Sequence, residues 1–313
     1  MSHIKIKNLF SEAVTSVASD ISGYTIHAKK DLTRNKKLPS DKLISFMVSC
    51  GSSSTKIELS DFFGMCADAL SVSAFNQQRG KLKPEAPEAV FNHFNASVQS
   101  GEKTSGYRFF AADGSTFTFF SKPKFAPGEY HVCQGHSAKG FYSMHLNAFY
   151  DLQKHTYSDA LIQPVRQKDE FDAFCTMVDR YPSLSGVNDV FIGDRGYCSY
   201  NNMAHVLEKG QYFLFRTKDI HSKGLVGNFD FLEEDSFDIR VNVTLVRSHK
   251  RKIAVKKEFY RRYVDVNATF DYLAYALRIP MIYPFGLSGF PYQKIPVNVL
   301  SQICREMNSL RRR

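Results

Sequence analysis

The chain has 313 residues and a mass of 35.6 kDa, a length typical of about two domains. It is 43% hydrophobic with 27 Phe and 16 Tyr, which excludes a chain that is disordered throughout. No apolar run approaches the roughly 20 residues of a membrane span, so we expect no membrane partner. Six scattered cysteines without a CxxC motif indicate reduced thiols in a cytoplasmic protein.

The first hundred residues have a helical pattern. Ser40 is expected to cap one helix and Ser60 a second one, while Pro84 opens a third helix whose apolar positions form one stripe. The stretch 70–84 before Pro84 also reads as helical and is rich in Asn, Gln, Lys and Arg. Such side chains can reach phosphates or base edges, as in a helix-turn-helix, but an ordinary surface helix has the same pattern.

Near residue 106 the pattern changes to alternating strands. The order β, β, β, α, β, α, β is expected over residues 107–115, 141–152, 158–165, 168–182, 188–194, 199–210 and 211–218. Three meandering strands followed by alternating helices and strands predict an α/β fold, a mixed sheet with helices on both faces.

The last third of the chain returns to strand-like alternation in residues 237–249 and 256–266, which predicts a separate β-rich element. The end, residues 276–313, is rich in Pro and Gly and fits neither periodicity. The net charge of +10 is concentrated here, because residues 221–313 carry +7. Residues 247–262 hold eight basic side chains and one Glu, which suits a phosphate-rich partner or a solvated charged face.

Two carboxylates stand at comparable places in this layout. Asp113 is expected to end the first strand of the sheet, and Asp194 to end the strand before the residues Arg-Gly-Tyr. Side chains at the carboxyl ends of neighbouring strands converge, and two bare carboxylates about 4 Å apart repel by roughly 4 kcal/mol at an effective dielectric constant of 20. The pair therefore predicts Mg²⁺ or Mn²⁺ between them. Alternatively, each Asp is only a turn or cap residue, since Asp-Gly is a common turn dipeptide.

Several segments, taken in order, resemble bacterial insertion-sequence transposases of the DDE type. These segments are SAFNQQRGKLKPEAPEAVFNHFN, ADGST, YSMHLNAFYDLQKHTYSDALIQP and DVFIGDRGYCSYNNMAHVLEKGQYFLFRTK, the last with a DRGY signature. The resemblance is to the IS-four family, covers roughly residues 60–275, and implies a ribonuclease-H-like catalytic fold.

The resemblance implies that Asp113 and Asp194 hold the catalytic metal ions, which activate water or a DNA 3′-hydroxyl for attack on a phosphodiester. It implies that Arg195 and Tyr197 support the site or contact DNA, and the alternative is that they belong to a purely structural turn. The other residues expected to bind DNA are Arg79, Lys81, Arg247, Lys250, Arg251, Lys252, Lys256, Lys257, Arg261 and Arg262. The partners would be double-stranded DNA at transposon ends and targets, and a second copy of the chain in a synaptic complex.

Three regions follow from the pattern and the resemblance together. Residues 1–105 would be a helical DNA-binding region and residues 106–220 the first part of the catalytic core. Residues 221–313 would be a partial β-rich insertion followed by a tail unlike the family.

The family completes its site with a Glu in the pattern Tyr-x2-Arg-x3-Glu-x6-Lys, which this sequence does not contain. One explanation is a truncated or frameshifted transposase that is read out of frame from about residue 277. The other is a divergent enzyme that recruits Glu208, Glu258 or Glu306. We therefore expect a DDE transposase whose strand transfer is weak or absent. The alternatives are a non-catalytic protein that binds transposon ends or modulates an intact transposase, and a structure-specific nuclease.

Overall fold

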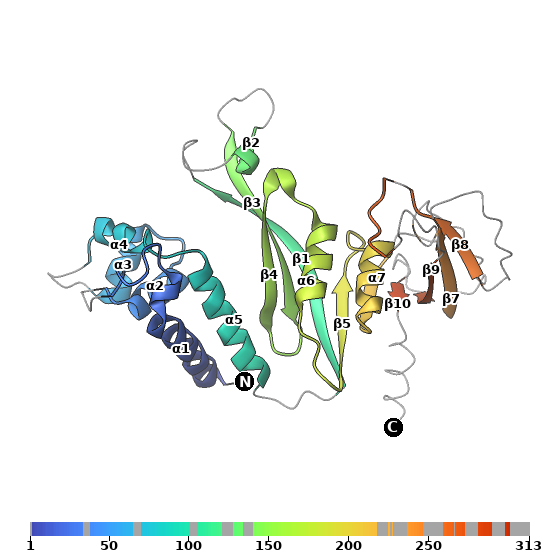
Figure 1. The fold of residues 1–313 in the computed structure, drawn as a ribbon, viewed down its shortest axis with the longest axis horizontal. Coiled ribbons are helices and arrows are strands. Elements are labelled where there is room, and N and C mark those ends of the chain that lie inside the picture. The colour runs from blue at the N-terminus through green and yellow to red at the C-terminus, as the bar shows by residue number, and fades with distance from the viewer. Residues whose placement is uncertain are drawn as a thin grey trace. The chain divides into compact units, whose positions relative to one another are not determined.

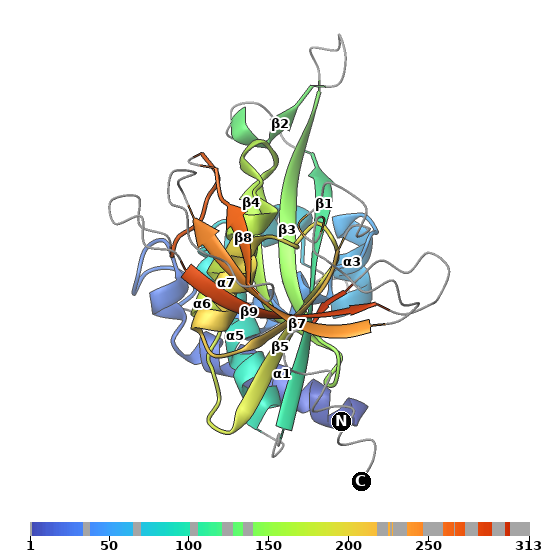
Figure 2. The same ribbon diagram turned by 90° about the vertical axis from the view of Figure 1, so that its right-hand side faces the viewer.

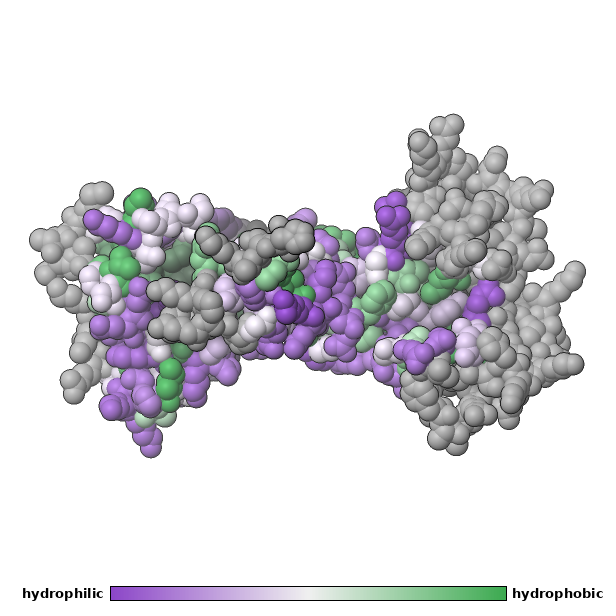
Figure 3. Space-filling model, turned by 90° about the horizontal axis from the view of Figure 1, so that it is seen from above, coloured by the Kyte–Doolittle hydropathy of each residue, from purple (hydrophilic) through white to green (hydrophobic). Residues whose placement is uncertain are grey.

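The chain forms two compact units, Met1–Lys103 and Thr104–Arg313, in the computed structural model (Figure 1). The structure describes residues 2–33, 38–64, 70–100, 106–120, 128–133, 140–217, 225, 227, 237–246, 259–265, 267–272, 281–289 and 298–300. Within these residues, no helix combines the length and the apolar character needed to cross a membrane. On the face seen in Figure 3, apolar residues are interspersed with hydrophilic ones.

The first unit is helical, as expected. Its helices are α1 (His3–Ser19), α2 (Ser40–Ser49), α3 (Thr55–Phe63), α4 (Val72–Arg79) and α5 (Glu85–Ser100), with a short 3₁₀ helix at Ile21–Tyr24. One apolar cluster joins α1 to α5 through Val14, Val17 and Val90. A second cluster surrounds Phe46 of α2, whose ring packs edge-on against Phe75 of α4 at 4.9 Å between centroids. Burial of these faces, rather than propensity alone, stabilises such short helices.

Two helix starts differ from the sequence prediction. Pro39, not Ser40, is the N-cap residue of α2. The helix expected to begin at Ser60 begins at Thr55, with Ser54 at the N-cap position but without a side-chain cap hydrogen bond; the Glu58 carboxylate accepts the backbone N–H of Ser53 at 2.9 Å. The expected helical stretch 70–84 is helical only over α4.

The second unit is built on one mixed sheet. Its strands are β1 (Gly106–Phe119), β2 (His131–Val132), β3 (Phe141–Asp151), β4 (Thr156–Pro164), β5 (Val187–Gly193), β6 (Tyr212–Arg216), β7 (Phe237–Val246), β8 (Phe259–Tyr263), β9 (Met281–Gly289) and β10 (Asn298–Leu300). The order is β2-β3-β1-β5-β6-β10-β9-β7-β8, with β4 paired to β3. The strands β1, β5 and β6 are parallel to one another, while β3 and β4 meander antiparallel. The predicted mixed α/β fold is confirmed.

Helices α6 (Glu170–Arg180) and α7 (Tyr200–Glu208) pack in one core on the same face of this sheet, whereas the sequence predicted helices on both faces. Asp169 caps α6 by accepting the backbone N–H groups of Phe171 and Asp172. The helices share a buried core with β1, β5 and β6, lined by Phe110, Phe174, Phe191, Met203, Phe213 and Phe215. Phe171, in the first turn of α6, is 44% exposed, although its spacing to Phe174 and Val178 predicts one apolar stripe.

The predicted β-rich segment forms β7 and β8, and these strands extend the same sheet instead of forming a sheet of their own. Met281–Gly289, where no regular element was expected, forms β9 and pairs antiparallel with β7 over nine residues. Figure 2 shows β7 and β9 crossing the direction of β1, β3 and β5, so the sheet twists strongly along its width.

A buried ion pair joins β1 to β5. Arg108 and Asp189 are opposite each other in the parallel register, and their side chains are each 1% exposed. The Arg108 guanidinium donates to both Asp189 oxygens, at 2.6 and 2.8 Å, and lies over the rings of Phe110 and Tyr181. Because both charges are removed from water, the pair stabilises this register only while both partners are present.

A second polar contact fastens the segment after β8 to the helices. The His205 ring of α7 lies between two carboxylates, 2.9 Å from Asp179 through Nδ1 and 2.8 Å from Asp271 through Nε2. Asp271 also accepts a hydrogen bond from the Asn201 side chain at 2.8 Å. These hydrogen bonds from Asn201 and His205 lower the pKa of Asp271.

Candidate active site

Asp113 lies in the middle of β1, not at its end. The 14-residue strand continues to Phe119, and Asp113 pairs with Ala148 of β3. The Asp-Gly dipeptide is therefore not a turn, because β3 pairs with β1 on both sides of it. A Cβ atom on Gly114 would lie 2.6 Å from Nε2 of His145, so the glycine is required by close packing of the two strands.

The register of the parallel strands brings the two aspartates to the same end of the sheet. The last parallel pair of β1 and β5 is Ala111 with Ile192. Asp113 and Asp194 each follow two residues later, and both are exposed. The two aspartates therefore lie at the same level of neighbouring parallel strands, Asp113 within β1 and Asp194 directly after β5.

Each carboxylate is oriented by its own backbone. The Asp113 Oδ1 atom accepts the N–H of Gly114 at 2.9 Å, and the Asp194 Oδ1 atom accepts the N–H of Gly196 at 2.7 Å. A Cβ atom on Gly196 would approach Asp194 Oδ1 to 2.8 Å, which explains the glycine of the DRGY sequence. Among the described residues, no other group donates to either carboxylate, so the Oδ2 atoms are available for a ligand.

Tyr197 lies beneath the turn that carries Asp194. It is 4% exposed, its backbone carbonyl accepts the Asn202 amide at 2.9 Å, and its ring packs against Phe174. Burial raises the pKa of Tyr197 well above its usual range, and the carboxylates of Glu170, Asp113 and Asp194 raise it further. So buried a side chain offers little surface to DNA, whereas Arg195 is exposed.

Glu170 and His145 were not singled out in the sequence. Glu170 opens α6, and its Oε1 atom lies 3.2 Å from Nε2 of His145, a residue 3% exposed whose Nδ1 is 3.0 Å from the hydroxyl of Thr116. The sequence marks Glu170 only as an acidic residue in the first turn of a helix, and acidic residues are common there because they interact favourably with the helix dipole. Glu170 is thus a third carboxylate that acts electrostatically on Tyr197 together with both aspartates.

No late glutamate joins this set in the part of the chain that the structure describes. Glu208 ends α7, whose length of about 12 Å separates it from the Asp194 turn. Glu258 and Glu306 lie outside the described residues. Over the described ranges, no group of three or more His, Cys, Asp or Glu is arranged to hold a metal ion. Two carboxylates with available oxygens nevertheless match the hard ligands that Mg²⁺ and Mn²⁺ prefer.

The predicted DNA-binding residues have different surroundings. Arg79 is exposed at the end of α4, and the Lys81 ammonium donates to Gln78 Oε1 at 3.1 Å. The half-buried Arg262 donates to the Gly227 carbonyl at 3.0 Å, so part of its guanidinium serves the fold. The residues outside the described ranges are Arg247, Lys250, Arg251, Lys252, Lys256 and Lys257, and the Arg261 side chain is likewise not described.

Comparison with known proteins supports one family. The family described as "Transposase DDE domain" matches residues 104–279 of this chain. The match covers more than half of the chain and includes both aspartates. A search of curated proteins finds no match. With its mixed sheet and paired aspartates, this chain belongs to the transposase DDE domain family.

Proposed function

We propose that the chain cleaves DNA phosphodiesters at transposon ends, with Asp113 and Asp194 holding the catalytic divalent cation. The observation that carries the proposal is the shared level of the two aspartates on neighbouring parallel strands. Their carboxylates keep an oxygen atom available on the solvent side while Gly114 and Gly196 orient the other.

Mg²⁺ or Mn²⁺ bound here would activate the attacking water or 3′-hydroxyl and stabilise the leaving oxygen. The protein's own contribution is to fix the two carboxylates and to keep the turn rigid through the buried Tyr197. Arg195, exposed beside Asp194, is suited to contact a DNA phosphate.

Strand transfer is expected to be weak. The sequence lacks the Tyr-x2-Arg-x3-Glu-x6-Lys pattern, and a two-carboxylate site has fewer ligands with which to hold its ion. We propose that Glu170 adds negative charge at this site, because it acts on Tyr197 with both aspartates. Its Oε1 atom also lies 3.2 Å from Nε2 of His145.

A Mg²⁺-dependent cleavage assay on transposon-end duplexes tests the proposal. Asp113→Asn and Asp194→Asn should each abolish cleavage and weaken Mn²⁺ binding, measured by calorimetry, while Glu170→Gln should weaken Mn²⁺ binding less. Asp61→Asn, an exposed position of α3 with the same change of charge, is the matched control and should behave as the wild type. Equal cleavage by all variants would remove the catalytic proposal.

The second candidate is a non-catalytic protein that binds transposon ends, which is favoured by the lack of a third grouped ligand in the described residues. It predicts DNA binding without cleavage at any Mg²⁺ or Mn²⁺ concentration. In either case we propose that the chain acts on double-stranded DNA in the cytoplasm, as a homodimer that pairs two ends. Crosslinking in the presence and absence of end DNA tests the dimer.

A further inference from the structure

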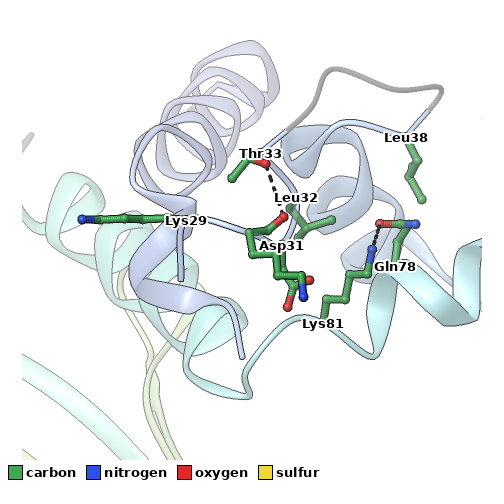
Figure 4. Close-up of a pocket in the computed structure, with 8 residues that line it drawn as sticks. Lys29, Asp31, Leu32, Thr33, Leu38, Gln78 and Lys81 are labelled. Carbon is green, nitrogen blue, oxygen red and sulfur yellow. Dashed lines mark hydrogen bonds between the residues drawn. The ribbon is translucent and has the colours of Figure 1, made fainter. Parts of the chain in front are cut away.

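A pocket of about 410 Å³ lies in the helical unit, between the turn at residues 29–33 and the end of α4. The polar side chains around it are Lys29, Lys30, Asp31, Thr33, Gln78 and Lys81 (Figure 4). Lysine supplies three of these groups, and only one is an acid. The pocket is therefore cationic.

The two walls of the pocket are fastened together. The backbone N–H of Ile26 donates to the Lys81 carbonyl at 3.0 Å, and the backbone N–H of Lys83 donates to the Tyr24 carbonyl at 2.9 Å. Between them, Thr25 and Leu82 form an isolated antiparallel β-bridge. These backbone contacts hold the segment before the turn against the segment after α4.

The turn that forms one wall has an unusual backbone. Lys29 and Leu32 have positive φ angles of 62° and 55°, a conformation that costs non-glycine residues about 1 kcal/mol or more each. Asp31 is 7% exposed, and its carboxylate accepts the backbone N–H of His27 at 3.1 Å. Its negative charge is therefore partly used within the turn, while Lys29 and Lys30 are exposed.

The opposite wall presents hydrogen-bond donors. Because the Lys81 ammonium donates to Gln78 Oε1 at 3.1 Å, the Gln78 amide nitrogen is oriented to donate in its turn. Figure 4 shows Lys81 and Gln78 together at one side, with Lys29 extending away from them. Arg79, one residue from Gln78, is exposed, and its guanidinium lies over the Phe75 ring, 5.5 Å from the ring centroid.

We propose that this pocket binds a phosphate of the DNA backbone, held by Lys30, Lys81 and the Gln78 amide, with Lys29 and Arg79 on neighbouring phosphates. Ammonium and amide donors around a small cavity match a phosphate group, and the exposed basic rim matches a polyanion rather than a small molecule. The proposal rests on the proposed action on DNA, and it assigns the contact to a particular site of the helical unit.

The salt dependence of duplex binding by the full chain tests this site. Each lost phosphate contact reduces the slope of log K against log[salt] by roughly 0.9, so Lys30→Gln with Lys81→Gln, which removes one phosphate contact, should reduce it by about 0.9. The control is Lys42→Gln with Lys56→Gln, two exposed lysines of α2 and α3 with the same change of charge. Lys30→Arg with Lys81→Arg should keep the wild-type slope. Circular dichroism establishes that each variant is folded.

Equal slopes for the pocket and control variants would overturn the proposal. Stabilisation of the wild type by inorganic phosphate, with no effect of the lysine changes on duplex binding, would overturn it in favour of a free anion. The Asp113→Asn variant separates this inference from catalysis, because it should lose cleavage and keep the full slope. A wild type that cleaves DNA while the pocket variants match the control would refute only the pocket.

Discussion

Replacing Arg108 by Met should destabilise the second unit strongly. The change removes the guanidinium and leaves Asp189, whose side chain is 1% exposed, as a buried carboxylate without its counter-ion. Removing one partner of such a pair costs about 3–5 kcal/mol. Loss of the stacking on Phe110 and Tyr181, at 5.2 and 5.3 Å, adds about 0.5–2 kcal/mol.

The same variant should show a characteristic pH dependence. Burial already raises the pKa of Asp189, and Arg108 opposes that rise. Without Arg108 the folded state binds a proton at Asp189 more readily than the unfolded state does, so the lost stability should return in part as the pH falls. Urea unfolding of the isolated variant and wild type at neutral and mildly acidic pH measures this difference.

A double variant supplies the control for this prediction. Arg108→Met with Asp189→Leu removes both charges and should recover most of the stability, because no buried charge is left without a partner. A loss below about 1 kcal/mol for Arg108→Met alone, or a double variant less stable than the single one, would refute the reasoning.

Three further predictions concern other parts of the fold. Gly114→Ala should lower the free energy of unfolding by about 1–3 kcal/mol, measured in urea, because its Cβ atom would lie 2.6 Å from His145; a neutral result would contradict the close packing. Because the pKa of Asp271 is lowered in the folded state, its carboxylate stabilises the wild type above the ordinary pKa of aspartate, and this stability is lost as the pH falls through the lowered pKa. Asp271→Asn removes this contribution, so the melting temperatures of the two proteins should differ at neutral pH and converge in acid. Phe46→Ala, at a position 1% exposed, should cost about 3–5 kcal/mol and unfold the helical unit first in calorimetry; a single unchanged transition would argue against two compact units.

Much of the sheet could be predicted because its elements carry strong local signals. Helix α6 combines a capping Asp169 with buried Phe174 and Val178, and both signals agree with its tertiary position. Residues 237–246 alternate clearly and form β7. Where local signal and burial point the same way, the sequence is sufficient.

The errors occurred where tertiary pairing overrides a local rule. Asp113-Gly114 has the composition of a turn, yet pairing with β3 keeps it extended. Ser60 has the composition of a cap, yet it lies inside α3, which begins at Thr55 and packs into the apolar cluster through the buried Leu59. The electrostatic grouping of Glu170 with the two aspartates depends on helix packing and had no counterpart in sequence spacing.

The unbroken course of β1 past Asp113 has a mechanical consequence. Six further residues, up to Phe119, stay paired with β3, which amounts to a ribbon of about 20 Å anchored at the aspartate. Displacing the outer part of the ribbon pulls on the same hydrogen-bond ladder that holds Asp113 in place. A molecule that binds to the ribbon and displaces it therefore changes the distance between this carboxylate and Asp194.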